Sequence, residues 1–159
     1  MKKLAAFFIS IAMTAGFSAC YYDHSVVQTD PSEENILTEI TITVDKNIIL
    51  DGVLFDNETA RAFADMLPIT EQLWYPAEGF AKAFNLHEEI PDVYERTRNY
   101  EVGGLAYWYE GPSVAIFYSD RLERTVVPVV NIGRITSDVE IFEEYHDMIT
   151  IEKKEELPQ

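Results

Sequence analysis

The segment YEVGGLAYWYEGPSVAIFYS, residues 100–119, decides the fold. Side chains alternate along its first half: Leu105 and Tyr107 share one face and Ala106 and Trp108 the other, which is the period of a β-strand. The Glu-Gly-Pro-Ser that follows is typical of a turn. The residues after the turn are rich in β-branched and aromatic side chains, which favour strands. The segment therefore predicts a β-hairpin with aromatic side chains on both of its faces.

A second hairpin is predicted at the start of the globular part. Apolar and polar residues alternate over residues 36–44, which is the pattern of a half-buried strand. Residues 45–47, Asp-Lys-Asn, supply turn chemistry. A second strand is expected over residues 48–55, and its Asp51-Gly52 predicts a bulge or a kink.

Two short helices are predicted. The first lies within residues 56–68, where the apolar positions recur at helical spacing. These positions are Ala60, Phe63, Ala64 and Leu67. Asp56 or Asn57 can cap this helix, and Pro68 ends it. The pair Ser137 and Glu140 has the spacing of a capping box and predicts a second helix that runs through Phe142 and Tyr145.

Further strands are expected over residues 69–76, 126–135 and 147–152, whereas residues 77–100 give no clear pattern. Pro128 suggests an edge or a bulge in the second of these strands. The chain thus has seven or eight strands, mostly linked by hairpins. This count predicts a mainly β, mostly antiparallel fold with two short helices, closed into a barrel or a sandwich because closure removes exposed edges.

The first residues are typical of an export signal. Lys2 and Lys3 precede an apolar run over residues 4–17, and small residues follow it. The run is shorter than the roughly 20 residues that a transmembrane helix needs. A basic start, a short apolar centre and a small-residue cleavage site indicate a signal peptide over residues 1–19. The alternative is a buried N-terminal helix, which the absence of any polar face disfavours.

Cys20 is the only cysteine of the chain. The sequence Phe-Ser-Ala-Cys at residues 17–20 resembles the lipobox of bacterial lipoproteins. The resemblance implies cleavage before Cys20 and acylation of that cysteine, and two or more acyl chains hold a protein stably on a membrane. Tyr21, in place of an aspartate, implies delivery to the outer membrane of the cell envelope. Simple secretion with a free thiol is the alternative.

The organisation expected is a signal peptide over residues 1–19, a flexible tether over 20–35, one domain over 36–152 and a charged tail over 153–159. The formal net charge is −16. Nucleic-acid binding requires basic patches against phosphate, and the sequence shows none. An anionic bilayer would repel such a surface, so the lipid on Cys20 is the expected link to the membrane.

No pattern of catalytic or metal-binding residues stands out. His24, His87 and His146 are scattered, without the spacing of a zinc site. Ser113 lies in a turn sequence and not in a nucleophile elbow, and the pair Gly103-Gly104 does not form a phosphate-binding loop. We therefore predict no cofactor, no metal and no catalytic residue, although the enzymatic status stays open.

Three segments, in this order, are similar to the small bacterial cyclophilin-like domain family: NETARAFADMLP at residues 57–68, GGLAYWYEGPSVAIFY at 103–118 and NIGRI at 131–135. The resemblance implies a closed, cyclophilin-like β-barrel with helices over its open ends. True cyclophilins are peptidyl-prolyl isomerases with an arginine beside a Phe-His-x-Ile-Ile-Pro run, and this chain has no such run. Fold alone does not carry the activity.

The abundant aromatic residues indicate a binding surface. We expect Tyr75 and Trp108 to line a groove together with Arg121 or Arg134, because aromatic and arginine side chains recur at binding sites. Arg134 also fits a structural ion pair or a cap on a carbonyl. The function predicted is a non-enzymatic module that binds a peptide, an envelope protein or a small ligand. A peptidyl-prolyl isomerase with altered residues is the alternative, and an enzyme of another class is a third possibility.

Overall fold

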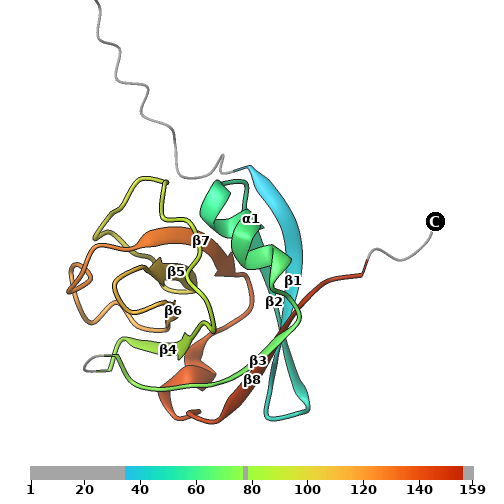
Figure 1. Ribbon diagram of the computed structural model, residues 1–159. Helices are drawn as coiled ribbons and strands as arrows, with labels where there is room; N and C mark the ends of the chain where they lie inside the picture. The colour runs from blue at the N-terminus through green and yellow to red at the C-terminus, as the bar shows by residue number, and fades with distance from the viewer. Residues whose placement is uncertain (1–34, 77–78, 156–159) are drawn as a thin grey trace, which may run out of the picture. The chain divides into compact units, whose positions relative to one another are not determined.

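The structure is a computed structural model that describes residues 35–76 and 79–155 (Figure 1). The predicted signal peptide, Cys20 and the tether up to residue 34 lie outside the described residues, as does His24. Residues 156–159 of the predicted tail also lie outside them. The expectations for these segments therefore stay predictions.

Eight strands form one antiparallel sheet. Their bounds are β1 Ile36–Val44, β2 Ile48–Phe55, β3 Ile69–Gln72, β4 Ala81–Asn85, β5 Gly104–Trp108, β6 Ser113–Phe117, β7 Val130–Ile135 and β8 Met148–Lys153. The strand order is β3-β8-β1-β2-β7-β5-β6-β4. The two outer strands approach each other through an isolated bridge between Trp74 and Ala83, with N–H to O=C distances of 2.8 and 2.9 Å. The sheet is therefore a nearly closed barrel, and the predicted mainly β, antiparallel fold is confirmed.

The alternation predicted for the β5–β6 hairpin is confirmed. Leu105 and Tyr107 lie in the main core inside the barrel, whereas Ala106 and Trp108 belong to a second cluster on the outer face. The β1–β2 hairpin also follows its pattern, because Ile40, Ile42 and Val44 are fully buried. Since strand side chains alternate between faces, each hairpin contributes one row to the interior and one row to the outside.

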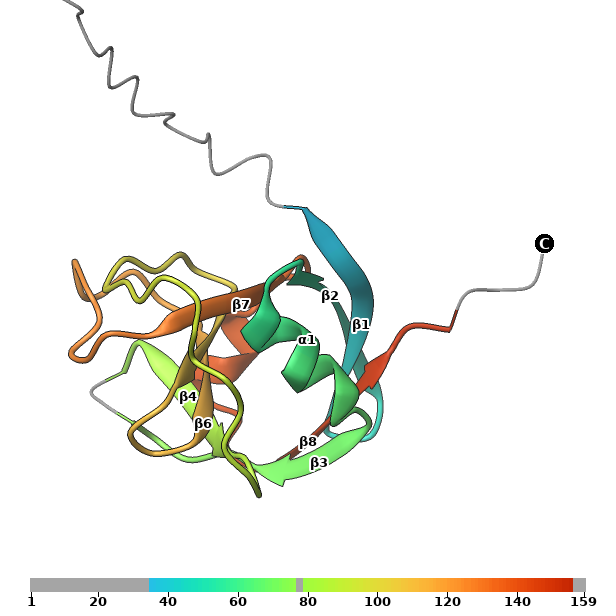
Figure 2. The ribbon, with the colours of Figure 1, turned by 45° about the horizontal axis from the view of Figure 1, so that its top comes forward.

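The helix α1, Glu58–Asp65, lies across one opening of the barrel (Figure 2). The Asn57 side chain caps it, because its Oδ1 accepts a hydrogen bond of 2.9 Å from the Ala60 N–H. The helix buries Phe63 and Ala64 against the interior. The predicted first helix, its apolar face and its cap at Asn57 are confirmed.

The second predicted helix is wrong. Residues 140–143 form only a single 3-10 turn, η2 Glu140–Glu143, so the domain has one α-helix and this turn. The predicted capping box fails because the Ser137 hydroxyl accepts from the Asp51 N–H at 2.9 Å instead. Asp138 instead accepts the hydrogen bond at the start of this turn: its Oδ1 accepts from the Glu140 N–H at 2.9 Å.

The bulge predicted at Asp51-Gly52 is also wrong. The β1–β2 register runs without interruption through Gly52, and the shift between these strands lies near Ile36 instead. Gly52 is needed because a Cβ there would lie 3.0 Å from the Arg134 carbonyl oxygen of β7. A close approach of two strands, and not a bulge, explains this glycine.

Steric constraints explain why glycine occupies positions 103 and 133 in the segments that resemble the family. Gly103 adopts φ +90°, in the region that side chains rarely occupy. A Cβ on Gly133 would lie 2.3 Å from the Val53 carbonyl oxygen, closer than any real contact. Both glycines therefore let β7 lie tightly against its neighbours.

Lys153 and Lys154 continue the ordered domain beyond the predicted boundary at residue 152. Lys153 ends β8, and the Lys154 ammonium forms ion pairs of 3.2 Å with Glu39 and 3.1 Å with Asp51. Over the described ranges, no helix has the length and apolar character that crossing a membrane requires.

Candidate functional site: an apolar groove on the outer face of the barrel

The floor of a groove is formed by small side chains on the outer face of β4, β5 and β6. Ala83 pairs directly with Ala115, and Ala115 pairs with Ala106 on its other side. At the centre of these strands the outward positions carry methyl groups, with Trp108 and Phe117 at the ends, while the inward positions carry Phe84, Tyr107 and other large residues. Small side chains cannot fill the space above the sheet, so a depression remains there.

Two tryptophans stand beside this floor. Trp74 is fixed by its bridge to Ala83 and by its Nε1–H, which donates to the Asn85 Oδ1 at 3.0 Å. Trp108 extends from the end of β5, and its ring lies against Gly111, where a Cβ would come within 2.7 Å of it. Trp74 and Trp108 are the only tryptophans of the chain.

The far wall is the loop between β6 and β7. The Thr125 hydroxyl donates to the Val127 carbonyl oxygen at 2.7 Å, and the Thr125 N–H donates to the Arg98 carbonyl oxygen at 2.9 Å. The Tyr100 hydroxyl donates to the Leu122 carbonyl oxygen at 2.6 Å. These bonds hold a long connection against the sheet, while Val126 at its tip is 63% exposed.

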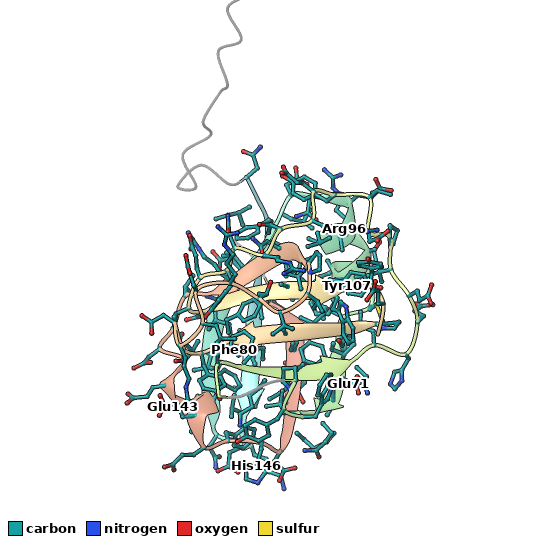
Figure 3. The ribbon with its side chains drawn as sticks, turned by 90° about the vertical axis from the view of Figure 1, so that its left-hand side faces the viewer. Glu71, Phe80, Arg96, Tyr107, Glu143 and His146 are labelled. Atoms are coloured by element: carbon teal, nitrogen blue, oxygen red, sulfur yellow. The ribbon has the colours of Figure 1, made fainter. Side chains whose placement is uncertain are left out.

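An aromatic cluster closes the base of the loop. The Phe80 and Phe117 rings are stacked with centroids 5.8 Å apart, and Tyr100 lies 4.6 Å from Phe117. Phe80, labelled in Figure 3, comes directly before β4. Offset stacking of this kind adds to the free energy gained by burial. The wall of the groove is thus anchored by aromatic packing as well as by hydrogen bonds.

The resulting cavity has a volume of about 370 Å³, within the range of small-ligand sites. Among the described residues its lining carries no charged side chain; the polar side-chain atoms are those of the two indoles and of Ser113 and Thr125. The Trp108 Nε1–H is buried and has no hydrogen-bond partner within the described part of the chain. Chemically the groove can hold an apolar group. We call this cavity the tryptophan groove.

The four residues predicted from sequence lie in different places. Trp108 lines the tryptophan groove. Arg134 lines a separate, more polar cavity of about 330 Å³ with Tyr100 and Asn131. Tyr75 instead covers the Lys82 amine, with the Nζ 3.3 Å from its ring centroid. The structure therefore does not bring the four residues around one cavity.

Arg121 lies beside Gly79 and does not line the tryptophan groove. A Cβ on Gly79 would lie 2.7 Å from an Arg121 guanidinium nitrogen. Burial raises the pKa of the Tyr118 phenol, the nearby Tyr75 and Glu143 raise it further, and Arg121 lowers it. Tyr75 and Arg121 are thus both neighbours of Tyr118.

Sequence reasoning missed most of the tryptophan groove. The missed residues are Trp74, Phe80, Ala83, Ala115, Phe117 and Thr125–Val127. One local signal was present: alanines occupy the central outward positions of β4, β5 and β6. A row of small residues on one face of adjacent strands indicates that something else must cover that face.

Metal-ligating side chains are dispersed. Within residues 35–76 and 79–155, histidine and carboxylate groups form no set of three placed to hold a metal ion. His87 pairs with the Glu71 carboxylate at 2.9 Å, and His146 bonds to the Glu144 carbonyl oxygen at 2.8 Å through its Nδ1. Both histidines therefore have local partners within the described domain.

Comparisons with known proteins agree on the fold. A model of the cyclophilin-like family matches residues 42–152. The solution structure of the hypothetical protein AF2241 from Archaeoglobus fulgidus is similar with a TM-score of 0.60 and 23% identity, covering 77% of this chain and 98% of that chain. At this identity the likeness concerns the fold alone. No curated protein matches the sequence.

Proposed function

The chain belongs to the cyclophilin-like family, and we propose that it is a binding protein whose tryptophan groove holds an apolar side chain of a polypeptide. A lipid on Cys20 anchors the domain in the bacterial cell envelope, at the outer membrane. The single observation that supports the binding role is the open apolar cavity between Trp74 and Trp108.

An apolar side chain fits this cavity for energetic reasons. Moving apolar surface out of water contributes about 25 cal/mol per Å², and the groove offers alanine methyl groups below and aromatic rings at the sides. Aromatic residues are frequent at the centres of interfaces because they bury large areas. The affinity expected is that of a weak, transient contact, since a single side chain fills the groove.

A polypeptide fits better than a plain hydrocarbon because of Trp108. Its buried Nε1–H lacks an acceptor within the described part of the chain, and an unpaired buried donor costs about 1–3 kcal/mol. Because this atom is buried, the Trp108 ring has to turn before a backbone carbonyl beside the bound side chain can supply that acceptor. The hydroxyl of Ser113, which also lines the groove, suits the same backbone.

Intrinsic fluorescence tests the proposal directly, because the only two tryptophans line the groove. The full-length chain is titrated with a library of short peptides that lack tryptophan and differ in one central residue. Peptides with central leucine, phenylalanine or proline are expected to change the emission, and those with serine or aspartate are not. A response that is the same for all central residues would contradict the proposal.

A variant that fills the groove gives the decisive test. Ala115→Leu places a larger side chain on the floor and is expected to lower peptide affinity at least tenfold. Thr43→Leu makes a comparable change on the outer face of β1, which three strands separate from β6 in the sheet. This variant is expected to leave affinity unchanged. Equal affinities of the two variants would place the binding site elsewhere.

The same peptides separate binding from catalysis. A proline-containing peptide isomerises in tens of seconds or more without a catalyst. If the chain accelerates this step and Ala115→Leu abolishes the acceleration, the groove is an isomerase site, and the purely binding role is replaced. Rates equal to background, with binding retained, support the binding role.

The anchor is tested independently of the groove. Wild-type chain is expected in the membrane fraction and Cys20→Ser chain in the aqueous fraction, since lipid is the proposed link. Mass spectrometry is expected to find acyl chains on Cys20. An unmodified thiol, or a Cys20→Ser chain that stays with the membrane, would refute the anchor without affecting the groove.

A further inference from the structure

Lys82 is a lysine that the described domain buries completely, with 0% of its surface exposed. It lies in β4 between Ala81 and Ala83, which both line the tryptophan groove. Because side chains alternate along a strand, Lys82 points away from the groove. Its cross-strand partner Ile116 belongs to the interior core.

The Lys82 amine has no conventional partner. Its Nζ forms no hydrogen bond with any part of the chain that the structure describes. This is unexpected in a protein that has 28 aspartates and glutamates against 12 lysines and arginines. Buried charges are normally paired with an opposite charge, because desolvation is costly. Within the described residues, no acidic group pairs with this amine.

Two tyrosine rings surround the amine instead. The Nζ lies 3.3 Å from the ring centroid of Tyr75 and 5.6 Å from that of Tyr118. A cation over an aromatic face is stabilised, but by less than an ion pair with hydrogen bonds. Tyr118 is buried and forms a fixed wall, whereas Tyr75 is 53% exposed and forms the outer cover.

We propose that Lys82 is the anchor of a binding site for a small carboxylate that carries an apolar or aromatic group, and that such a ligand takes the place of the Tyr75 ring over the amine. The carboxylate would pair with the Nζ, and the apolar part would pack on the Tyr118 ring. This site lies on the opposite face of β4 from the tryptophan groove and does not depend on the function proposed for that groove.

The surrounding charges favour one acidic group. Arg121 lies beside Gly79 and close enough to Tyr118 to act on its phenol, so a second positive charge borders the site. Glu143 acts on the same phenol from the η2 turn, which lies toward the lower end of the domain in Figure 3. Among the described residues, Lys82 and Arg121 therefore outnumber the one carboxylate, Glu143, that acts on Tyr118, which favours an anionic ligand over a cationic one.

Calorimetric titration of the full-length chain with sodium benzoate tests the site, with benzamide as the neutral control of the same shape. Benzoate is expected to bind and benzamide is not. N-acetylphenylalanine and its amide form a second pair, which distinguishes a peptide C-terminus from a small aromatic acid as the source of the carboxylate. Failure of both acids to bind the wild type and the Tyr75→Ala variant would overturn the proposal.

Variants assign the binding to the amine. Lys82→Met keeps the length of the side chain without its charge and is expected to weaken benzoate binding at least tenfold. Lys153→Met, at an exposed lysine of β8, is the matched control and is expected to have no effect. Tyr75→Ala removes the competing ring and is expected to tighten binding. Benzoate affinity that is equal in the wild type and in Lys82→Met would refute the site.

A labelling experiment needs no substitution of Lys82. An amine-acetylating reagent, read out by peptide mass spectrometry, is expected to modify Lys82 at least tenfold more slowly than Lys153 in the wild type. Tyr75→Ala is expected to raise the rate at Lys82, and added benzoate to lower it again. If Tyr75→Ala leaves the rate unchanged, Tyr75 is not the cover and the proposal fails.

Discussion

The domain has two aromatic regions on opposite sides of one sheet. Inside the barrel, Phe63, Phe84 and Phe142 are fully buried among isoleucines, leucines and valines. Outside, Phe80 and Phe117 pack on each other, on Tyr100, on alanines and on a few branched residues of the loop before β7, chiefly Val129. The inner region is filled from every side, whereas the outer region borders a cavity of about 370 Å³.

The difference lies in the share of alanines among the neighbours and not in the aromatic residues. A branched aliphatic neighbour fills the space around a ring, and protein interiors reach crystal-like density in this way. An alanine neighbour leaves space that only another chain or a ligand can fill. The inner region therefore specifies the fold, and the outer region is available for binding.

The largest test of this contrast compares two phenylalanines on β4 and just before it. Phe84→Ala is expected to cost about 3–5 kcal/mol of unfolding free energy, because a closed interior cannot collapse around the lost ring. Phe80→Ala, at the edge of the open groove, is expected to cost less. Urea denaturation measures both. Equal costs would mean that the outer cluster is as closely packed as the interior.

The second test compares alanine substitutions at two glycines, one in each region. Gly133→Ala puts a Cβ against the Val53 backbone oxygen, which must move with β2, and such overpacking costs about 1–3 kcal/mol. Gly111→Ala meets only the ring of Trp108. This variant is expected to keep its stability and to shift the tryptophan emission. A larger loss for Gly111→Ala than for Gly133→Ala would reverse the assignment of the rigid and adaptable sides.

The sequence predicted the inner region well, because its signals are local. Alternation placed Leu105 and Tyr107 on one face, which proved to be the inner one, and Asp56 or Asn57 marked the start of α1, where Asn57 is the cap. The tryptophan groove could not be predicted in the same way. It depends on the pairing of Thr97 with Val129 and of Trp74 with Ala83, which join segments far apart in the sequence. Ser137 failed as a helix cap for the same reason, since Asp51 on a distant strand takes its hydroxyl.

A buried hydroxyl in the inner region gives the next effect. The Tyr107 hydroxyl accepts from the Ile90 N–H at 3.3 Å. Tyr107→Phe leaves that donor without a partner and is expected to cost about 1–3 kcal/mol. Denaturation of this variant beside the wild type measures the cost. A loss of zero would mean that water reaches Ile90, and the inner region would then be less closed than its packing indicates.

The same tyrosine makes the stability of the inner region depend on alkaline pH. Burial raises the pKa of Tyr107 above 10.0, Glu89 and Asp92 raise it further, and the bond from Ile90 lowers it. Because the folded pKa exceeds the unfolded one, this contribution is fully present below pH ~10 and is lost as the pH rises through the folded value. Tyr107→Phe is expected to reduce the slope of unfolding free energy against pH above 10. An unchanged slope would assign the alkaline loss to other groups, such as Tyr118, whose pKa is also raised by burial.

The smallest effect on stability is expected in the outer wall, where it tests whether the groove is preformed. Thr125→Val removes the hydroxyl that donates to the Val127 and Arg98 carbonyl oxygens, a change of about 0.5–1.5 kcal/mol. Peptide affinity is expected to fall by more than this small loss implies, because the loosened loop must be ordered on binding. Fluorescence titration of this variant gives its peptide affinity, and denaturation gives its unfolding free energy. If affinity is unchanged while stability falls, the loop does not shape the groove, and the contrast between a closed inner region and an adaptable outer region would rest on the sheet alone.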